Sequence, residues 1–145
     1  MKWLVLTVGK PALPYAKAGR DEYLRRIALY AKINHEAIKA SDRTRESAEL
    51  LERSRNSFRL VLDEKGRAFT SREFARFVDS LQLGARPVTV IVGGADGHDE
   101  ALTRAADTTW SLAPLTLQHE LALVVALEQI YRAHTIIAGH PYHRD

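Results

Sequence analysis

Short runs of aliphatic residues alternate with amphipathic segments along this chain, and this alternation limits the possible folds more than any other feature. The expected strands are residues 3–8, a weaker run 33–38, 58–62 and 88–92. The expected helices between and after them are residues 15–29, 45–55, 71–83, a stretch from about 99, and 120–137. Strands that alternate with helices form mostly parallel sheets with helices on both faces. We therefore expect a single α/β domain over residues 1–145.

The helix expected over residues 71–83 has the clearest start signal in the chain. Thr70 and Glu73 have the spacing of a capping box, in which each side chain satisfies a backbone amide at the helix start. The apolar side chains Phe74, Phe77, Val78 and Leu81 then recur on one face. This pattern predicts a surface helix whose apolar face packs on the sheet.

The last expected helix, residues 120–137, is apolar around nearly its whole circumference. Such a helix is buried on more than one side. In a chain of 145 residues a second copy is a natural way to cover it, and we expect a homodimer.

Composition excludes several classes of function. The chain has no cysteine, which rules out disulfides, Cys-ligated zinc, iron–sulfur clusters and thiol catalysis. Its N-terminal apolar run is too short for a signal peptide, and no membrane span is expected, so we predict a cytoplasmic protein. The excess of 21 Lys and Arg over 18 Asp and Glu is small, and it indicates either general solubility or a local patch that binds nucleic acid.

The glycine-rich segment 93–97 follows the most regular expected strand. Three glycines in five residues let the backbone turn sharply and approach a ligand closely, although a plain strand-to-helix turn has the same composition. The spacing matches neither Gly-x-Gly-x-x-Gly nor a P-loop, which disfavours a dinucleotide fold and an NTPase. Because ligands of such sheets sit beyond the carboxyl ends of the strands, this segment is a candidate site.

Two further segments are candidates on chemical grounds. Residues 111–119 are nearly uncharged and lead into the last helix, so they suit either a purine and a thioether or simple core packing. The tail combines Tyr142, His143 and Arg144. Many termini are frayed, but Tyr and His stack on bases and Arg binds phosphate or a developing oxyanion.

A metal site is not expected. His119 and Glu120 begin a His-Glu-x-x-His pattern, but Leu123 stands where the second histidine would be. His140 and His143 would need ligands from elsewhere in the chain. Ser111 lacks the sequence context of a nucleophile elbow.

Several of these motifs occur together, in the same order, in a known family. The chain resembles the ribosomal RNA large-subunit methyltransferase H family of the SPOUT superfamily from end to end. The segments that carry the resemblance are Val8-Gly9, Glu22-Tyr23-Leu24-Arg25-Arg26, Val61-Leu62-Asp63, the turn at 93–97, the segment 110–119, Ile130-Tyr131-Arg132-Ala133, and the tail at 140–143.

The resemblance implies a fold and an activity. It implies a homodimer whose C-terminal segment forms a trefoil knot around a pocket for S-adenosylmethionine, and methylation of N3 of a pseudouridine in 23S rRNA of the assembled ribosome. The family's cofactor contacts correspond to Leu62, Gly93, Ala113, Pro114, Leu115, Thr116, Leu117 and Gln118. Another RNA target, such as 2′-O-methylation of tRNA, and a non-catalytic RNA-binding domain are the alternatives.

The chain departs from the family at a few positions. Ala113, Pro114 and Gln118 differ from the usual residues of the loop, and Leu123 replaces an arginine in the last helix. These loop changes leave backbone contacts in place, whereas Leu123 removes a cation.

The tail residues have expected roles in methylation of a uracil-like base. N3 must lose its proton before it attacks the methyl group, and His143 is the expected base because its ordinary pKa lies near neutrality. Arg144 is expected to stabilise the negative charge on the base, and Tyr142 to stack on it.

Overall fold

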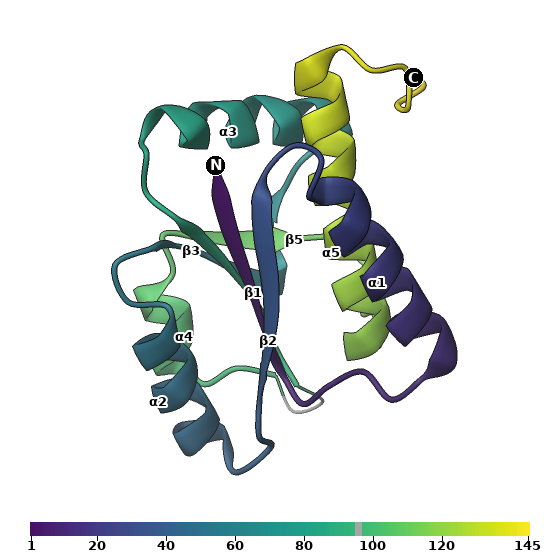
Figure 1. Cartoon of the computed structure of the whole chain (residues 1–145). Coiled ribbons are helices and arrows are strands. Elements are labelled where there is room, and N and C mark those ends of the chain that lie inside the picture. Colours follow the sequence, from purple (N-terminus) through teal and green to yellow (C-terminus); the bar gives the residue numbers. More distant parts are fainter. Residues whose placement is uncertain (95–96) are drawn as a thin grey trace.

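The structure is a computed structural model that describes residues 1–94 and 97–145. Five parallel strands form one sheet in the order β2-β1-β4-β3-β5 (Figure 1). Their bounds are β1 (Lys2–Val8), β2 (Lys32–Ile38), β3 (Phe58–Ala68), β4 (Val88–Val92) and β5 (Thr108–Ser111). The four predicted strands are confirmed. β5 was not predicted, because its four residues, Thr-Thr-Trp-Ser, contain no aliphatic run.

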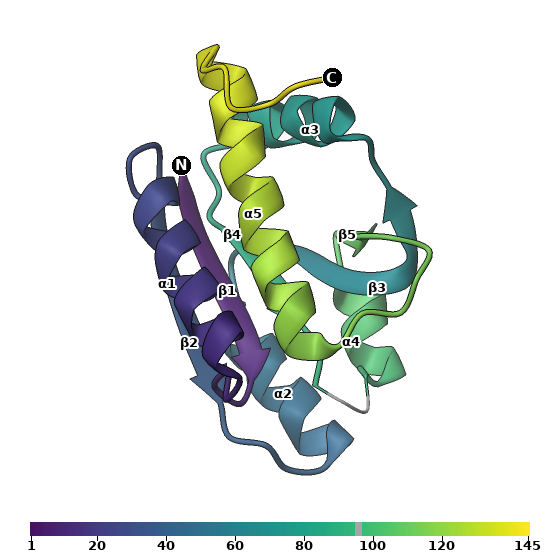
Figure 2. The ribbon, with the colours of Figure 1, turned by 90° about the vertical axis from the view of Figure 1, so that its right-hand side faces the viewer.

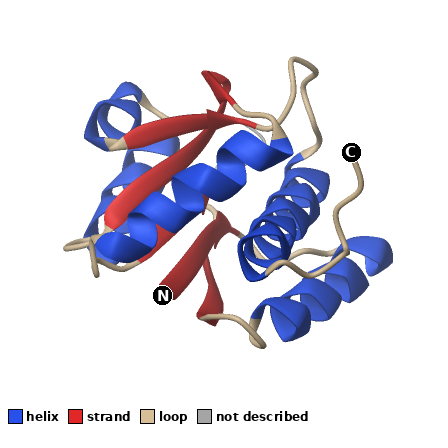
Figure 3. Cartoon of the chain, turned by 90° about the horizontal axis from the view of Figure 1, so that it is seen from above, coloured by secondary structure: helices blue, strands red, loops and turns tan. Residues whose placement is uncertain are grey.

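Helices cover both faces of the sheet, as predicted. Their bounds are α1 (Pro14–Ile27), α2 (Arg43–Arg53), α3 (Ser71–Leu83), α4 (Glu100–Ala105) and α5 (His119–Ala138). Helices α1 and α3 pack against α5 on one face, and α2 packs against α4 on the other (Figures 2 and 3). The α/β class and the parallel sheet are therefore confirmed, while the trefoil knot remains a prediction.

The capping box at the start of α3 is confirmed. The Thr70 hydroxyl accepts a hydrogen bond from the Glu73 amide at 3.1 Å, and the Glu73 carboxylate accepts one from the Thr70 amide at 2.9 Å. Both contacts satisfy amides that a helix start leaves without partners.

The sheet divides the core into two layers. All five residues of β4 are buried, and they alternate between the layers as the period of two in a strand requires. Val88, Val90 and Val92 pack with α1, α3 and α5, whereas Ile91 packs with α2 and α4. A strand buried on both faces explains why four of the residues 88–92 are aliphatic, and the hydroxyl of the fifth, Thr89, shares a hydrogen bond with the Ser57 hydroxyl.

Helix α5 is the largest single contributor to the core. Eight of its 20 residues are buried, and it lies on the sheet between α1 and α3 (Figure 2). It approaches α1 closely at Gly19, where a Cβ atom would come within 2.9 Å of Val124 Cγ1. Among the described residues it is the one helix whose length and apolar composition would allow it to cross a membrane, but its packing is that of a core helix.

His134 of α5 is a buried polar group with one hydrogen-bond partner. Its Nε2 accepts a hydrogen bond from Trp3 Nε1 at 3.0 Å, and its ring stacks on Tyr30 with centroids 6.1 Å apart. Burial lowers the pKa of His134 to about 4, because the charged form would lose its hydration. The neutral imidazole is therefore the form that the folded protein holds.

This burial predicts a loss of stability in mild acid. The pKa of His134 is lower in the folded than in the unfolded chain, so the unfolded chain binds more protons as the pH falls from about 6.5 to about 4. Between pH 7 and pH 5 this one group should cost about 2 kcal/mol of unfolding free energy. Urea denaturation at both pH values measures it. A His134→Gln variant, which can still accept from Trp3, should lose that much less, and an equal loss in both proteins would contradict the assignment.

Candidate functional site

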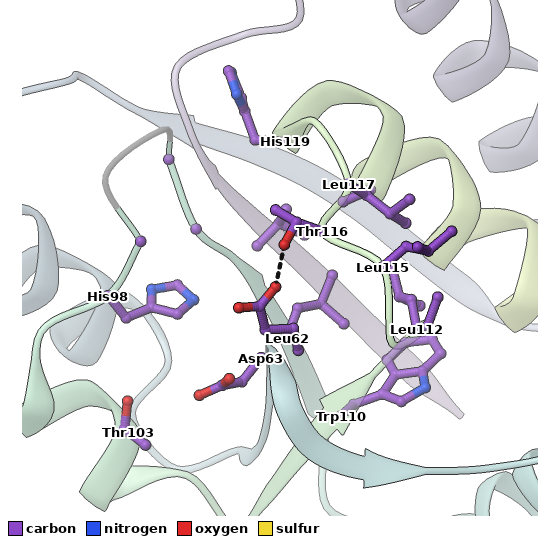
Figure 4. Close-up of a pocket in the computed structure, with 17 residues that line it drawn as sticks. Leu62, Asp63, His98, Thr103, Trp110, Leu112, Leu115, Thr116, Leu117 and His119 are labelled. Atoms are coloured by element: carbon purple, nitrogen blue, oxygen red, sulfur yellow. Dashed lines mark hydrogen bonds between the residues drawn. The ribbon is translucent and has the colours of Figure 1, made fainter.

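A cavity of about 350 Å³ opens at the carboxyl end of β4, between residues 62–64 of β3 and the segment that leads into α5 (Figure 4). Parallel sheets of this class bind ligands at this edge. The cavity is lined by Leu62, Asp63, Glu64, Val92, Gly93, Gly94, Gly97, His98, Thr103, Trp110, Leu112, Ala113, Leu115, Thr116, Leu117, His119 and Ala122. Its volume lies within the ordinary range for small-molecule sites.

An interruption in the pairing of β3 with β5 shapes one wall. Trp110 pairs with both Leu62 and Arg67, so the register shifts across residues 63–66, a bulged stretch of β3 that we call the loop-out. Gly66 makes this possible, because a Cβ atom there would come within 2.7 Å of the Thr109 carbonyl carbon. Asp63 and Glu64 lie on this stretch and line the cavity.

The opposite wall is the segment 112–117, which has no helix or strand. The Thr116 hydroxyl donates a hydrogen bond to Glu64 Oε2 at 2.5 Å, which joins this wall to the loop-out (Figure 4). The Ser111 hydroxyl donates to the Ala113 carbonyl at 3.1 Å. The wall therefore depends on side-chain contacts for its position.

Gln118 ends this wall by capping α5. Its side-chain oxygen accepts hydrogen bonds from the amides of Glu120 at 2.9 Å and Leu121 at 3.0 Å. The Glu120 carboxylate in turn accepts from the Leu13 amide at 2.9 Å, which ties the segment before α1 to the start of α5. These contacts fix the first turn of α5 beside the cavity.

The glycine turn supplies bare backbone to the cavity. Gly93 and Gly94 follow β4, and Gly97 has a φ of 74°, which favours glycine. A Cβ atom on Gly93 would come within 3.0 Å of His98 Cε1, so a side chain there would crowd the imidazole. Residues 95–96 of this predicted turn lie outside the described residues.

His98 is a pocket residue that the sequence analysis missed. Its Nε2 is shielded from solvent and has no hydrogen-bond partner among the described residues. Burial lowers the pKa of His98, although the nearby Asp63 carboxylate opposes the shift. Its place directly after Gly97, at the end of a turn already expected to meet a ligand, was the available signal.

The cavity has an apolar and acidic character. Its walls combine aliphatic side chains and the Trp110 ring with the carboxylates of Asp63 and Glu64. None of the described residues that line it is Lys or Arg. Such a site suits an aromatic ring system and a neutral or cationic group, and it does not suit a polyphosphate.

The tail turns back from the end of α5 toward α3 (Figure 2), and its Tyr142 reaches Glu128 in the middle of α5. The Tyr142 hydroxyl donates to Glu128 Oε1 at 3.0 Å, and the Arg132 guanidinium lies 4.7 Å from the centroid of the Tyr142 ring. Burial raises the pKa of Tyr142, and the contact with Glu128 adds to the shift. Tyr142 is therefore a neutral hydrogen-bond donor.

Both ring nitrogens of His143 have partners. Its Nδ1 lies 3.0 Å from Arg132 Nη1, and its Nε2 lies 3.0 Å from Asp145 Oδ1. Asp145 also forms an ion pair with Arg72, which anchors the end of the chain to the start of α3. Arg144 is exposed.

The structure brings together only part of the predicted site. Leu62, Gly93, Ala113, Leu115, Thr116 and Leu117 all line the cavity, whereas Pro114 and Gln118 do not. Glu128, the partner of Tyr142, lies six residues beyond Ala122, the last residue of α5 that lines the cavity, which is roughly 9 Å along the helix axis. The tail residues of a chain are thus separated from its own cavity. No group of three His, Asp or Glu side chains suited to a metal occurs among the described residues.

Comparison with known proteins adds independent findings. A family model described as a predicted SPOUT methyltransferase matches residues 1–143. A Thermus thermophilus protein named ribosomal RNA large subunit methyltransferase H is 45% identical over 144 residues, with 99% of each chain covered. A protein of that name from Deinococcus radiodurans is 39% identical over 145 residues, again with 99% of each chain covered.

One solved structure supports the fold. A probable methylase family protein from Haemophilus influenzae aligns with a TM-score of 0.59 and 12% sequence identity, over 99% of this chain and 70% of that chain. At this identity the likeness concerns the arrangement of helices and strands alone.

The close packing of Gly66 against β5 gives a test of the loop-out. Gly66→Ala should lower the unfolding free energy by about 1–3 kcal/mol, because the new methyl group meets backbone atoms that cannot move aside. Gly84→Ala is the matched control, since its Cβ atom would lie 3.5 Å from its nearest neighbour. Thermal unfolding of both variants measures the difference, and equal midpoints would show that the loop-out tolerates a side chain.

Proposed function

The chain belongs to the SPOUT methyltransferase family, and we propose that it transfers a methyl group from S-adenosylmethionine to N3 of a pseudouridine in 23S rRNA of the assembled ribosome. Relatives named for methylation of large-subunit ribosomal RNA, at 45% and 39% identity over nearly the whole chain, support an RNA substrate of this class. The proposed site of action is the cytoplasm, where ribosomes are found.

The observation that carries the proposal is the composition of the cavity. Six of the residues expected to hold the cofactor, from three separate parts of the sequence, line it together. Its apolar walls and the bare backbone at Gly93 suit an adenine ring and a thioether chain. The Asp63 carboxylate suits ribose hydroxyls and a positive charge.

S-adenosylmethionine, when bound, supplies a methyl group on a positively charged sulfur. The residues of the chain then have to position the base in line with that methyl group and exclude water. We assign the holding of the cofactor to Leu62, Gly93 and the segment 113–118, in which Pro114 and Gln118 support the loop from outside the cavity.

His143 is the proposed base for the N3 proton. Its neighbours define a tautomer, since Arg132 can only donate to Nδ1 and Nε2 then donates to the Asp145 carboxylate. Both nitrogens are occupied in this arrangement. The lone pair that can take a proton is on Nδ1, so the contact with Arg132 is the one that has to open before His143 can accept a proton. Arg144 is proposed to stabilise the anionic base, and Tyr142 to orient it.

A homodimer would complete the site. The tail of a chain lies on the middle of its own α5, so we propose that Tyr142, His143 and Arg144 of one protomer act at the cavity of its partner. Apolar side chains at both ends of α5 remain partly exposed, among them Leu121 at 36% and Ile137 at 37%. A second copy would remove this surface from water.

Methylation of ribosomes tests the proposed function. Purified protein with labelled S-adenosylmethionine should methylate intact ribosomes that lack the modification, and it should act far less on free 23S rRNA, because the proposed substrate is the assembled particle. Primer-extension arrest followed by mass spectrometry of the nucleosides should locate the methyl group on N3 of a pseudouridine. A methyl group on a ribose oxygen of tRNA, or binding of RNA without any transfer, would favour the alternative functions.

Action between protomers predicts complementation. His143→Ala should slow methylation at least about 100-fold by removing the base, and Gly93→Val should abolish it by filling the cofactor wall. When the two inactive variants are mixed and exchange subunits, about a quarter of the wild-type activity should return, because half of the dimers have one intact site. His140→Ala, an exposed neighbour, is the control and should stay active. Failure of the mixture to recover would show that each tail serves its own chain.

A further inference from the structure

Glu64 lies in the stretch of β3 where pairing with β5 is interrupted. β3 leaves the β5 ladder after Leu62 and rejoins it at Arg67, and Glu64 stands on the looped-out residues between them. An Asx-type contact, in which the Lys65 amide donates to Asp63 Oδ1 at 2.9 Å, stabilises the loop-out. On this stretch the Glu64 carboxylate accepts a hydrogen bond from Thr116 of the segment 112–117.

The segment 112–117 has few other constraints. Among the described residues, two side-chain hydrogen bonds join it to other elements: the Ser111 hydroxyl at the end of β5 donates to the Ala113 carbonyl, and the Thr116 hydroxyl donates to Glu64 of β3. Leu115 beside Thr116 is 74% exposed, so apolar packing holds this part of the wall weakly. A charge-assisted hydrogen bond of 2.5 Å is among the stronger contacts available to an exposed loop.

We propose that Glu64 is a positioning residue for cofactor binding, which acts by holding Thr116 and thereby the wall 112–117 over the cavity. The inference rests on the proposed function, because it takes S-adenosylmethionine as the ligand of this cavity. Without the contact the wall has to be ordered when the ligand binds, and the entropy of that ordering weakens affinity. With the contact the wall is already ordered.

A double-mutant cycle with S-adenosylmethionine as the probe tests this role. Glu64→Ala and Thr116→Val should each weaken binding about 3- to 10-fold in titration calorimetry, the size expected for one exposed, charge-assisted contact. The double variant should bind no more weakly than either single variant, because both substitutions remove the same contact. Dissociation of the ligand, followed by stopped flow, should accelerate by a similar factor.

Conservative variants distinguish the loss of this hydrogen bond from the loss of the Glu64 charge and from the loss of folding. Glu64→Gln and Thr116→Ser keep an acceptor and a donor, and both should bind within about 3-fold of wild type. Lys65→Ala is the matched control on the same loop-out, since its side chain is exposed and does not line the cavity. The thermal midpoints of the ligand-free variants should remain close to that of wild type, because the contact lies at the surface.

The outcomes distinguish this assignment from the proposed function. If wild type binds S-adenosylmethionine and the two single effects multiply in the double variant, or if neither variant weakens binding, the positioning role is wrong and the cofactor assignment stands. If wild type does not bind S-adenosylmethionine, the cofactor assignment fails, and the positioning role fails with it.

Discussion

The burial of α5 between α1, α3 and the sheet is the constraint on which the rest of the structure depends. Its first turn is fixed at the cavity, where Gln118 caps it and His119 contributes to the lining. Its middle holds the tail through Glu128 and Arg132. Both parts of the proposed site are thus attached to one rigid helix at different heights, and the burial of that helix keeps them apart within a single chain.

The sequence predicted most accurately the helices and strands whose formation depends on one dominant interaction. Strand β4 is buried on both faces, so its four aliphatic residues predicted it correctly, and the capping box of Thr70 and Glu73 predicted the start of α3. β5 was missed because its pairing with β3, rather than its own composition, makes it a strand. The family resemblance supplied the cofactor residues, since composition alone did not distinguish a ligand wall from core packing in the segment 111–119.

Features that depend on contacts between distant residues could not be predicted from local pattern. The loop-out of β3 requires Trp110 to pair twice, and nothing in the residues around Gly66 encodes that. The contact from Thr116 to Glu64 spans 52 positions of the sequence. His98 likewise became a pocket residue only through the packing of its ring against Gly93. The tail was predicted by residue type, but its distance from the cavity depends on the length and burial of α5.

The distribution of charge determines which part of the surface can bind RNA phosphates. The cavity has Asp63 and Glu64 in its walls and no Lys or Arg among the described lining residues, so RNA phosphates would be repelled there. Leu123, at the position where the family resemblance implies an arginine, is 1% exposed and belongs to the core, so it cannot supply a cation. The guanidinium of Arg144 lies instead on the exposed tail, with Arg72 and Arg132 nearby in contact with tail residues. An RNA substrate should therefore be attracted to the tail side of α5. Of the RNA, only the target base should enter the acidic cavity, because an uncharged uracil ring is not repelled by the carboxylates as the RNA phosphates would be.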